Sequence, residues 1–381
     1  MKNSVTRFTA ALGQRMVHHL LMLITLACFC ACATAQDGQT IEHLAMDRNG
    51  TRIVVQYRNA AIHRLVLADT GSGAMQVVAQ PENERWRWPV FSADGKWIAI
   101  NSCDIDDKGR VQENTSRIDV MRVDGSERRT IVAADGNAHG PFSFSPDGKR
   151  LVFGKGRLRD SSRPTDVDLY EVRLNGTSPR LVINGQFYQI SSVGYYAGKF
   201  YLTGQSPLRY LSGTPPAPAS YIPNAPQADK TRWGMQKNSL LYVRDDMSDT
   251  LTPFITFDYS GGTVLPWQQQ QEIEAVRVAA GAQRLFAVMR HRDYPQGQKI
   301  KHYIRDVFVM EPDKSFRRLT HFNTVRFNGF DITPDGRYLA VAPVPESGEA
   351  SRTPAFHRID TFSGDDRVFQ LDFSTLFSTN R

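Results

Sequence analysis

Positions 144–153 read Phe-Ser-Pro-Asp-Gly-Lys-Arg-Leu-Val-Phe. An apolar strand end runs into a tight Asp-Gly turn, and a second apolar strand follows; the glycine supplies the positive φ that such a turn needs. The same unit recurs at 91–100 and 332–341. Weaker copies lie at 46–55, 196–202 and 280–286. The sequence therefore predicts six β-hairpins that share one kind of turn.

A second hairpin is expected after each of these, at 64–78, 118–132, 168–182, 239–254, 306–320 and 357–370. Successive first turns are 45 to 54 residues apart, except for one interval of 84 residues after Gly198. Four strands per unit at a period near 50 is typical of a β-propeller blade. We therefore predict an all-β, six-bladed β-propeller of four-stranded antiparallel blades. A β-sandwich, the alternative, does not predict the strict alternation of the two hairpins.

The repeated unit resembles the PD40 repeat, which is similar to WD40 repeats, through the Phe-Ser-Pro-Asp-Gly-Lys run at 144–149 and its relatives at 91–96 and 332–337. On these motifs the chain resembles the TolB-like family of exported six-bladed propellers from about residue 40 onward. The resemblance implies the fold and a role in the cell envelope. TolB also has a mixed α/β domain before its propeller, and we expect no room for that domain here.

The N-terminal segment 1–35 predicts a secretory signal peptide. It carries three basic residues and no acid, then an apolar run at 20–30, then small residues at Ala33 and Ala35. The apolar run is shorter than the roughly 20 residues that span a bilayer. Cleavage leaves residues 36–381 as a single propeller domain with Cys103 as its one cysteine. We therefore expect a periplasmic protein whose stability comes from a large core rather than disulfides.

A lipid anchor is the alternative fate of this segment, because Ala27 precedes Cys28 and Ala31 precedes Cys32. We favour the soluble periplasmic form. Membrane contact is then expected only through a partner or through such an anchor. The chain is expected to be a monomer.

Composition excludes several classes of protein. The chain has 46 Lys and Arg against 39 Asp and Glu, and its formal charge of +7 falls to +4 once the signal peptide is removed. No clustered basic stripe is present, so we expect no nucleic-acid partner. Only the N-terminal segment is apolar enough to meet a membrane, which excludes a polytopic membrane protein.

The long and variable connections of a blade lie on one face of a propeller, opposite the short turns, and binding sites collect on such loops. The fourth blade carries a Pro-rich insertion at 205–237. We predict a polar or anionic ligand at the channel mouth on this face, where the candidate binding residues are Arg85, Trp86, Trp88, His139, Gln189, His291, His321, Arg326 and Asn328. The alternative is that Trp88 packs between blades and the polar residues solvate the rim.

No catalytic motif is visible, and we predict no catalytic residue, no cofactor and no bound metal ion. The expected function is non-enzymatic binding of a protein or peptide partner in the cell envelope. One enzymatic alternative stays open: a metal-dependent propeller lyase or hydrolase acting on an acidic saccharide. Its metal would be held by histidines from different blades, namely His139, His291, His302 and His321.

The first and last blades are each predicted to be complete without sharing a strand. We therefore expect a weak closure of the ring, with fraying at 40–48 and 366–372.

Overall fold

The computed structural model describes the following residues: 39–59, 62–159, 163–187, 189–205, 240–245, 250–255, 272–291, 304–344 and 354–377. The described residues all belong to one compact unit, which begins at Gln39. The predicted signal peptide, His302 and nearly all of the insertion at 205–237 lie outside the described residues. No described helix is long and apolar enough to cross a membrane.

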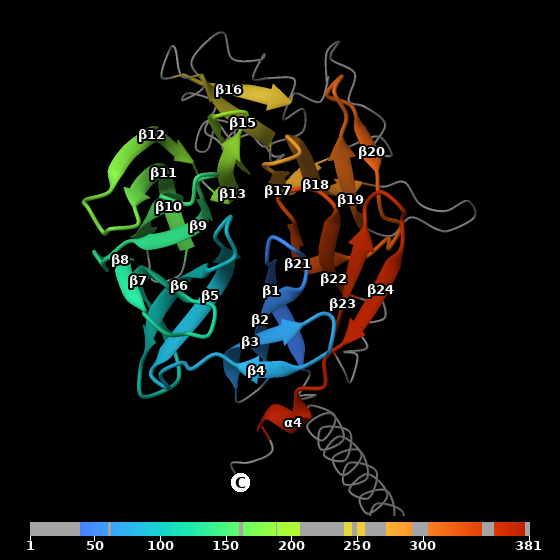
Figure 1. Cartoon of the computed structure of the whole chain (residues 1–381). Coiled ribbons are helices and arrows are strands. Elements are labelled where there is room, and N and C mark those ends of the chain that lie inside the picture. The colour runs from blue at the N-terminus through green and yellow to red at the C-terminus, as the bar shows by residue number, and fades with distance from the viewer. Residues whose placement is uncertain are drawn as a thin grey trace, which may run out of the picture. The chain divides into compact units, whose positions relative to one another are not determined.

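The described strands form four-stranded antiparallel sheets in which neighbouring strands follow one another along the chain (Figure 1). The first sheet contains β1 (Thr40–Met46), β2 (Arg52–Arg58), β3 (His63–Asp69) and β4 (Met75–Val77). The second contains β5 (Glu84–Phe91), β6 (Trp97–Ile105), β7 (Val111–Arg122) and β8 (Arg129–Val132). The third contains β9 (Ala138–Phe144), β10 (Arg150–Arg159), β11 (Arg163–Arg173) and β12 (Arg180–Phe187).

The second half of the chain repeats this arrangement. The fourth sheet contains β13 (Gln189–Tyr196), β14 (Lys199–Gln205), β15 (Leu240–Asp245) and β16 (Thr250–Ile255). The fifth contains β17 (Glu272–Ala279), β18 (Arg284–His291), β19 (Ile304–Met310) and β20 (Phe316–Arg318). The sixth contains β21 (Arg326–Ile332), β22 (Tyr338–Val344), β23 (Ala355–Asp360) and β24 (Asp366–Gln370), and the short helix α4 (Ser374–Phe377) follows it.

The repeated turn motif works through its serine and aspartate as well as its glycine. In the third sheet the Asp147 carboxylate accepts hydrogen bonds from the Ser145 hydroxyl and the Lys149 backbone N–H. Gly148 adopts a φ of 66°, in the left-handed region that glycine enters without steric cost. An aspartate side chain that bonds its own backbone two residues on favours a turn. The sequence motif therefore closes the first hairpin of a blade by local bonds alone.

Buried apolar side chains form six clusters, and each cluster joins two sheets that are adjacent along the chain or, in one case, the sixth sheet and the first. Polar bonds cross the same seams. The Trp88 N–H donates to Gln56 Oε1 of the first sheet at 3.1 Å, and the Val276 N–H donates to the Ser192 hydroxyl of the fourth sheet at 3.0 Å. The sheets therefore follow one another around a ring, and we call the first strand of each sheet its inner strand.

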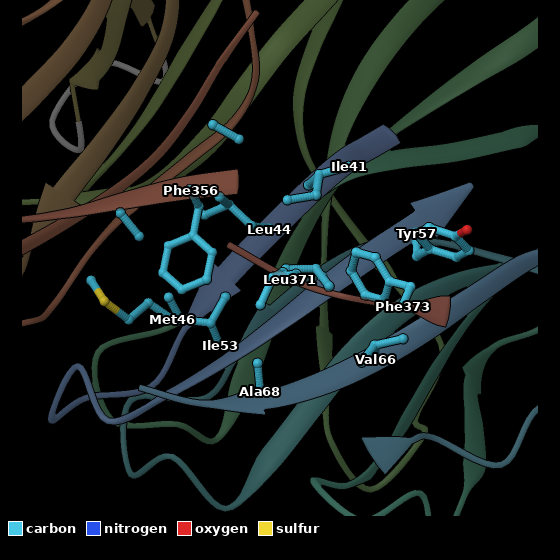
Figure 2. Close-up of a cluster of buried hydrophobic side chains, with 13 residues drawn as sticks. Ile41, Leu44, Met46, Ile53, Tyr57, Val66, Ala68, Phe356, Leu371 and Phe373 are labelled. Carbon is cyan, nitrogen blue, oxygen red and sulfur yellow. The ribbon is translucent and has the colours of Figure 1, made fainter. Parts of the chain in front are cut away.

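The seam between the sixth and first sheets closes the ring by side-chain packing (Figure 2). The chain leaving β24 places Phe373 against Tyr57, with ring centroids 4.2 Å apart. Asp331 Oδ2 accepts a hydrogen bond from the Met46 N–H at 2.8 Å. Met46 and Leu371 are both buried in this seam. This packing does not support the expected fraying of the two ends.

The predicted fold class, an all-β propeller with four-stranded antiparallel blades, is confirmed. The strands lie where the hairpins were predicted. In the fourth sheet, the side chains of β15 and β16 are outside the described residues. The count of six complete blades is therefore taken up as part of the proposal below.

Candidate functional site

The inner strands begin at one end of the channel and finish at the other. We call the first the loop end, since the connections between blades arrive there, and the second the turn end, since the Asp-Gly turns lie there. Among the predicted binding residues, Arg85, Trp88, His139 and Arg326 lie on the first parts of inner strands, at the loop end.

A break in the β5–β6 register after Arg87 sets the position of Trp88. Such a bulge re-aims a side chain relative to a regular strand. Trp88 adopts a φ of 54°, and its ring lies edge-on to His43 at 6.2 Å and against Gly140, where a Cβ would come within 2.5 Å of the indole. Trp88 is partly buried between three blades. This matches the alternative interpretation of Trp88 as a residue that packs between blades.

Arg85, on β5, has no carboxylate within ion-pair distance among the described residues. Its Nη1 lies 2.8 and 2.9 Å from the two ring nitrogens of His63. Its Nε is buried and has no hydrogen-bond partner among the described residues. Burial lowers the pKa of Arg85, Glu42 raises it, and the charges of Arg58 and two further arginines lower it again. Arg85 therefore lies in a locally positive region.

The acids near Arg85 are engaged by other groups. Glu42 accepts from Arg58 Nη1 at 3.0 Å and also from the Gln56 amide. Glu113 pairs with Arg87 Nη1 at 2.8 Å. We call Arg58, Arg64, Arg85, Arg87 and His63 the loop-end cation cluster. Its four arginines face two carboxylates, and neither carboxylate lies within ion-pair distance of Arg85 in the part of the chain described.

Histidine adds no positive charge to this cluster at neutral pH. Burial, followed by the charge of Arg85, lowers the pKa of His63 to about 4. Burial also lowers the pKa of His43 to about 4. A neutral imidazole can accept a hydrogen bond from a guanidinium, which a protonated one cannot. His63 therefore orients Arg85 without neutralising it.

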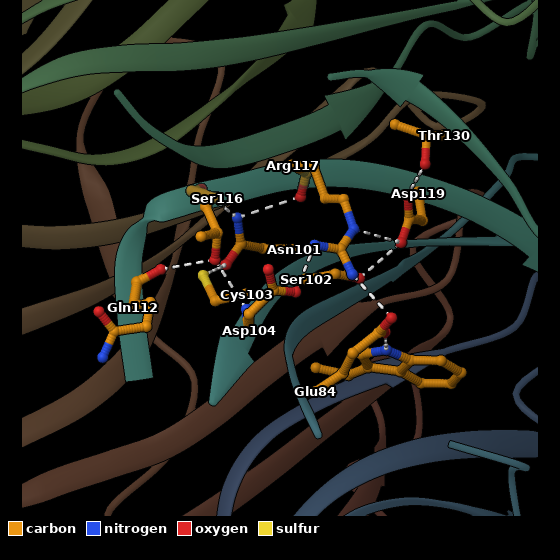
Figure 3. Close-up of polar contacts among 12 residues, drawn as sticks. Glu84, Asn101, Ser102, Cys103, Asp104, Gln112, Ser116, Arg117, Asp119 and Thr130 are labelled. Atoms are coloured by element: carbon orange, nitrogen blue, oxygen red, sulfur yellow. Dashed lines mark hydrogen bonds and ion pairs between the residues drawn. The ribbon is translucent and has the colours of Figure 1, made fainter. Parts of the chain in front are cut away.

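A second group of arginines, which lies entirely in the second blade, has its charges fully matched (Figure 3). Arg117 contacts Glu84 Oε1 at 2.7 Å and Asp104 Oδ1 at 2.8 Å. Arg128 contacts Glu84 Oε2 at 2.6 Å and Asp119 Oδ2 at 2.5 Å. Asp119 is fully buried. We call these five residues the paired network.

Trp86, predicted at the channel mouth, belongs to this network. It is 2 % exposed, its indole N–H donates to Glu84 Oε2 at 2.7 Å, and Arg128 lies over its ring at 4.8 Å. The prediction of an exposed ligand contact was wrong for Trp86, because consecutive residues of a strand face opposite sides of the sheet. Trp86 points into the seam between the first and second sheets.

His139 and His291 are also interior residues rather than rim residues. His139 is 1 % exposed, and its Nδ1 donates to the Ser116 carbonyl of the neighbouring blade at 2.8 Å. His291 is 2 % exposed, with Nε2 3.2 Å from Asp306 Oδ2. Their rings pack edge-on to core phenylalanines. The prediction that they line the channel mouth was wrong because each imidazole is held within the blades.

Asp306 and Asp119 are a pair of residues that sequence reasoning missed. Asp306 accepts from the Thr320 hydroxyl at 2.9 Å and pairs with an arginine two residues before that threonine. Asp119 accepts from the Thr130 hydroxyl at 2.7 Å and pairs with Arg128, again two residues earlier. The signal was an aspartate in the third strand followed by Arg-x-Thr in the fourth. These aspartates anchor the outermost strand of a blade.

The remaining candidates are spread around the loop end. His321 and Arg326 are exposed, and the Asn328 side-chain amide donates to the Thr40 hydroxyl across the closing seam at 3.1 Å. Gln189 opens β13, and its side chain lies outside the described residues. Among the described residues, no group of three or more His, Cys, Asp or Glu side chains is placed to hold a metal ion.

At the turn end, the described residues line a partly open cavity of about 120 Å³. All six inner strands contribute to its wall, and its charged members are Arg48, Arg277 and Asp331. The binding site was predicted at the opposite end, so this cavity is a feature that the sequence did not reveal.

The similarities between this chain and known proteins lie in the fold. No protein-family model matches the chain, and no curated protein matches it by sequence. Among solved structures it is similar to TolB from Acinetobacter baumannii, with a TM-score of 0.53 and 15% identity over 87% of this chain and 63% of that one. The chain is a β-propeller. It spans less than two thirds of that TolB.

Two further solved structures have comparable similarity. Tricorn protease matches with a TM-score of 0.52 and 12% identity, over 87% of this chain and 26% of that one. Oligogalacturonate lyase in complex with manganese matches with a TM-score of 0.50 and 10% identity, over 87% of this chain and 77% of that one. These proteins differ in what they do, and a common fold does not fix function.

Proposed function

We propose that this protein is an exported, non-enzymatic propeller of six complete blades that binds a peptide or protein ligand in the cell envelope. The proposed ligand site is the loop end of the channel, and Arg85 receives an acidic group of the ligand there. Export is proposed from the signal-peptide pattern at 1–35. Six blades are proposed because six apolar clusters connect the sheets around the ring.

The state of Arg85 carries the proposal. A partly buried guanidinium without a carboxylate partner has lost hydration and gained no ion pair. An acidic side chain or a C-terminal carboxylate on a ligand would supply that partner in bidentate form. Arg58 and Arg64 add to the local field, since both lower the pKa of Arg85.

Peptide binding to the mature chain tests this proposal. An array of acidic and neutral peptides is screened first, and affinities of the selected peptides are then measured for the wild type, Arg85→Gln and Arg317→Gln. Arg317 is an exposed arginine paired with Glu311, on another blade, and serves as the matched control. We expect the selected peptides to be acidic. Arg85→Gln should lower the affinity for them about tenfold or more, which is the loss expected when a charged hydrogen bond is removed.

Peptides selected without any acidic residue would contradict the proposal. So would equal affinities for the wild type and Arg85→Gln.

A further inference from the structure

The cavity at the turn end is a second place where the propeller can hold a ligand. Polar and apolar groups contribute about equally to its wall, and the apolar part comes from side chains such as Leu44, Phe142, Phe144, Val193 and Ile332. A cavity of roughly 150 Å³ is large enough for a benzene-sized molecule. With about 120 Å³, this one suits a branched aliphatic group or a group of similar size.

Tyr201 points a hydroxyl group into this cavity. It belongs to β14, lines the cavity and is 3 % exposed. Its hydroxyl makes no hydrogen bond to any described residue, and its oxygen is accessible from the cavity rather than sealed in the core. Burial raises the pKa of Tyr201 to about 12, so the hydroxyl keeps its proton and remains a donor at neutral pH.

The chain is built to let this ring reach the channel. The cross-strand partner of Tyr201 in β13 is Gly194. A Cβ at Gly194 would lie 2.7 Å from both Cε1 and Oη of Tyr201, closer than side-chain carbons approach. The glycine therefore leaves the space through which the tyrosine ring crosses the inner strand.

Charged donors accompany the hydroxyl. Arg277 of β17 lines the same cavity, with Nε 3.5 Å from Asp331 Oδ1 and Nη1 donating to the Val276 carbonyl at 3.1 Å. A guanidinium has further N–H groups beyond these two. Asp331 also accepts from the Met46 N–H at 2.8 Å, so its carboxylate is already shared. Arg48 is exposed at the rim and has no acidic partner among the described residues.

The cavity therefore offers two arginines and one tyrosine hydroxyl against one engaged carboxylate, beside a set of apolar side chains. Donors of this kind match a carboxylate, and the apolar side chains match a hydrocarbon body. We propose that the turn-end cavity binds an aliphatic group that ends in a carboxylate, with Tyr201 and Arg277 donating to the carboxylate oxygens. Two sources share this chemistry: the C-terminal residue of a peptide, and a free monocarboxylic acid.

Titration calorimetry on the mature chain tests this site with three probes. They are N-acetyl-Ala-Leu with a free C-terminus, its C-terminal amide, and isocaproate. We expect the free acid of the peptide, isocaproate, or both to bind, and the amide to bind about tenfold more weakly than the peptide acid if the peptide is the source. Binding of the peptide acid alone identifies a C-terminus as the ligand, and binding of isocaproate alone identifies a free acid.

Tyr201→Phe is the decisive variant, because it removes the hydroxyl and keeps the ring that packs between the fourth and fifth sheets. We expect Tyr201→Phe to lower the affinity for the acid that binds about tenfold. Tyr170→Phe, a tyrosine in the seam between the second and third sheets, is the matched control and should leave the affinity unchanged. Gly194→Ala should reproduce the loss by displacing the Tyr201 ring.

Failure of all three probes to bind would overturn the proposal, as would equal binding of acid and amide or an unchanged affinity in Tyr201→Phe. The outcome is independent of the loop-end proposal. Arg85→Gln should leave binding at the turn end unaffected, so each site is refuted by its own variant.

Discussion

Two groups of arginines, one within the second blade and one shared by the first and second blades, differ in one respect. In the paired network, Arg117 and Arg128 contact three carboxylates between them at 2.5 to 2.8 Å. In the loop-end cation cluster, Arg85 has a neutral histidine as its nearest partner. Buried charges in proteins are normally paired. We therefore interpret the paired network as part of the structural framework, and the loop-end cation cluster as a site for an acidic ligand group.

The paired network should show the largest response when broken. Asp119→Ala removes the fully buried carboxylate that accepts hydrogen bonds from Arg128, Ser102 and Thr130. Breaking a buried ion pair leaves an uncompensated charge, and we expect the free energy of unfolding to fall by about 3–5 kcal/mol. Urea denaturation measures this loss. Asp124 lies in an exposed turn two residues after the end of β7. The free energy of unfolding of Asp124→Ala should therefore stay close to that of the wild type.

A stability of Asp119→Ala equal to that of its control would mean that the network contributes nothing to the framework. The contrast between the two arginine groups would then lose its basis.

The histidine of the loop-end cation cluster should give an intermediate, pH-dependent effect. The pKa of His63 is about 4 in the folded chain, below its ordinary 6.5, so the unfolded chain takes up a proton first as the pH falls. The stability that His63 contributes is therefore present above pH 6.5 and is lost as the pH falls toward 4. After allowance for solvent screening we expect a loss of about 1–2 kcal/mol.

The measurement is the free energy of unfolding of the wild type and His63→Gln at several pH values between 7 and 4. The free energy of unfolding of His63→Gln should decline less steeply than that of the wild type as the pH falls. His321→Gln, which changes an exposed histidine, serves as the control and should follow the wild type. Parallel curves for the wild type and His63→Gln would place His63 in a solvated environment and weaken the case for an unmatched Arg85.

Local sequence signals predicted most of the fold. The Asp-Gly turns and their Ser-x-Asp partners close hairpins by bonds within a few residues, so their positions could be read from the chain. The alternation of two hairpins per unit then gave four strands per blade. Closure of the ring was harder to foresee, since it depends on Phe373 meeting Tyr57 from the other end of the chain.

The candidate site was predicted less well, because partners across blades decide which polar residues are free. His139 donates a hydrogen bond to a carbonyl 23 residues earlier. The Trp86 indole donates a hydrogen bond to Glu84, and Arg128 lies over its ring. The bulge that turns Trp88 leaves no mark in the strand pattern. Tyr201 reaches the channel only because Gly194 opposes it, which requires the register of β13 and β14.

Arg85→Gln tests the central contrast most directly when stability and affinity are measured on the same protein preparation. We expect a free energy of unfolding within about 1 kcal/mol of the wild type, because no ion pair is broken, together with a loss of about tenfold or more in affinity for the selected acidic peptide. A loss of 3 kcal/mol or more in stability with unchanged affinity would contradict it, and would make Arg85 a framework residue like Arg128.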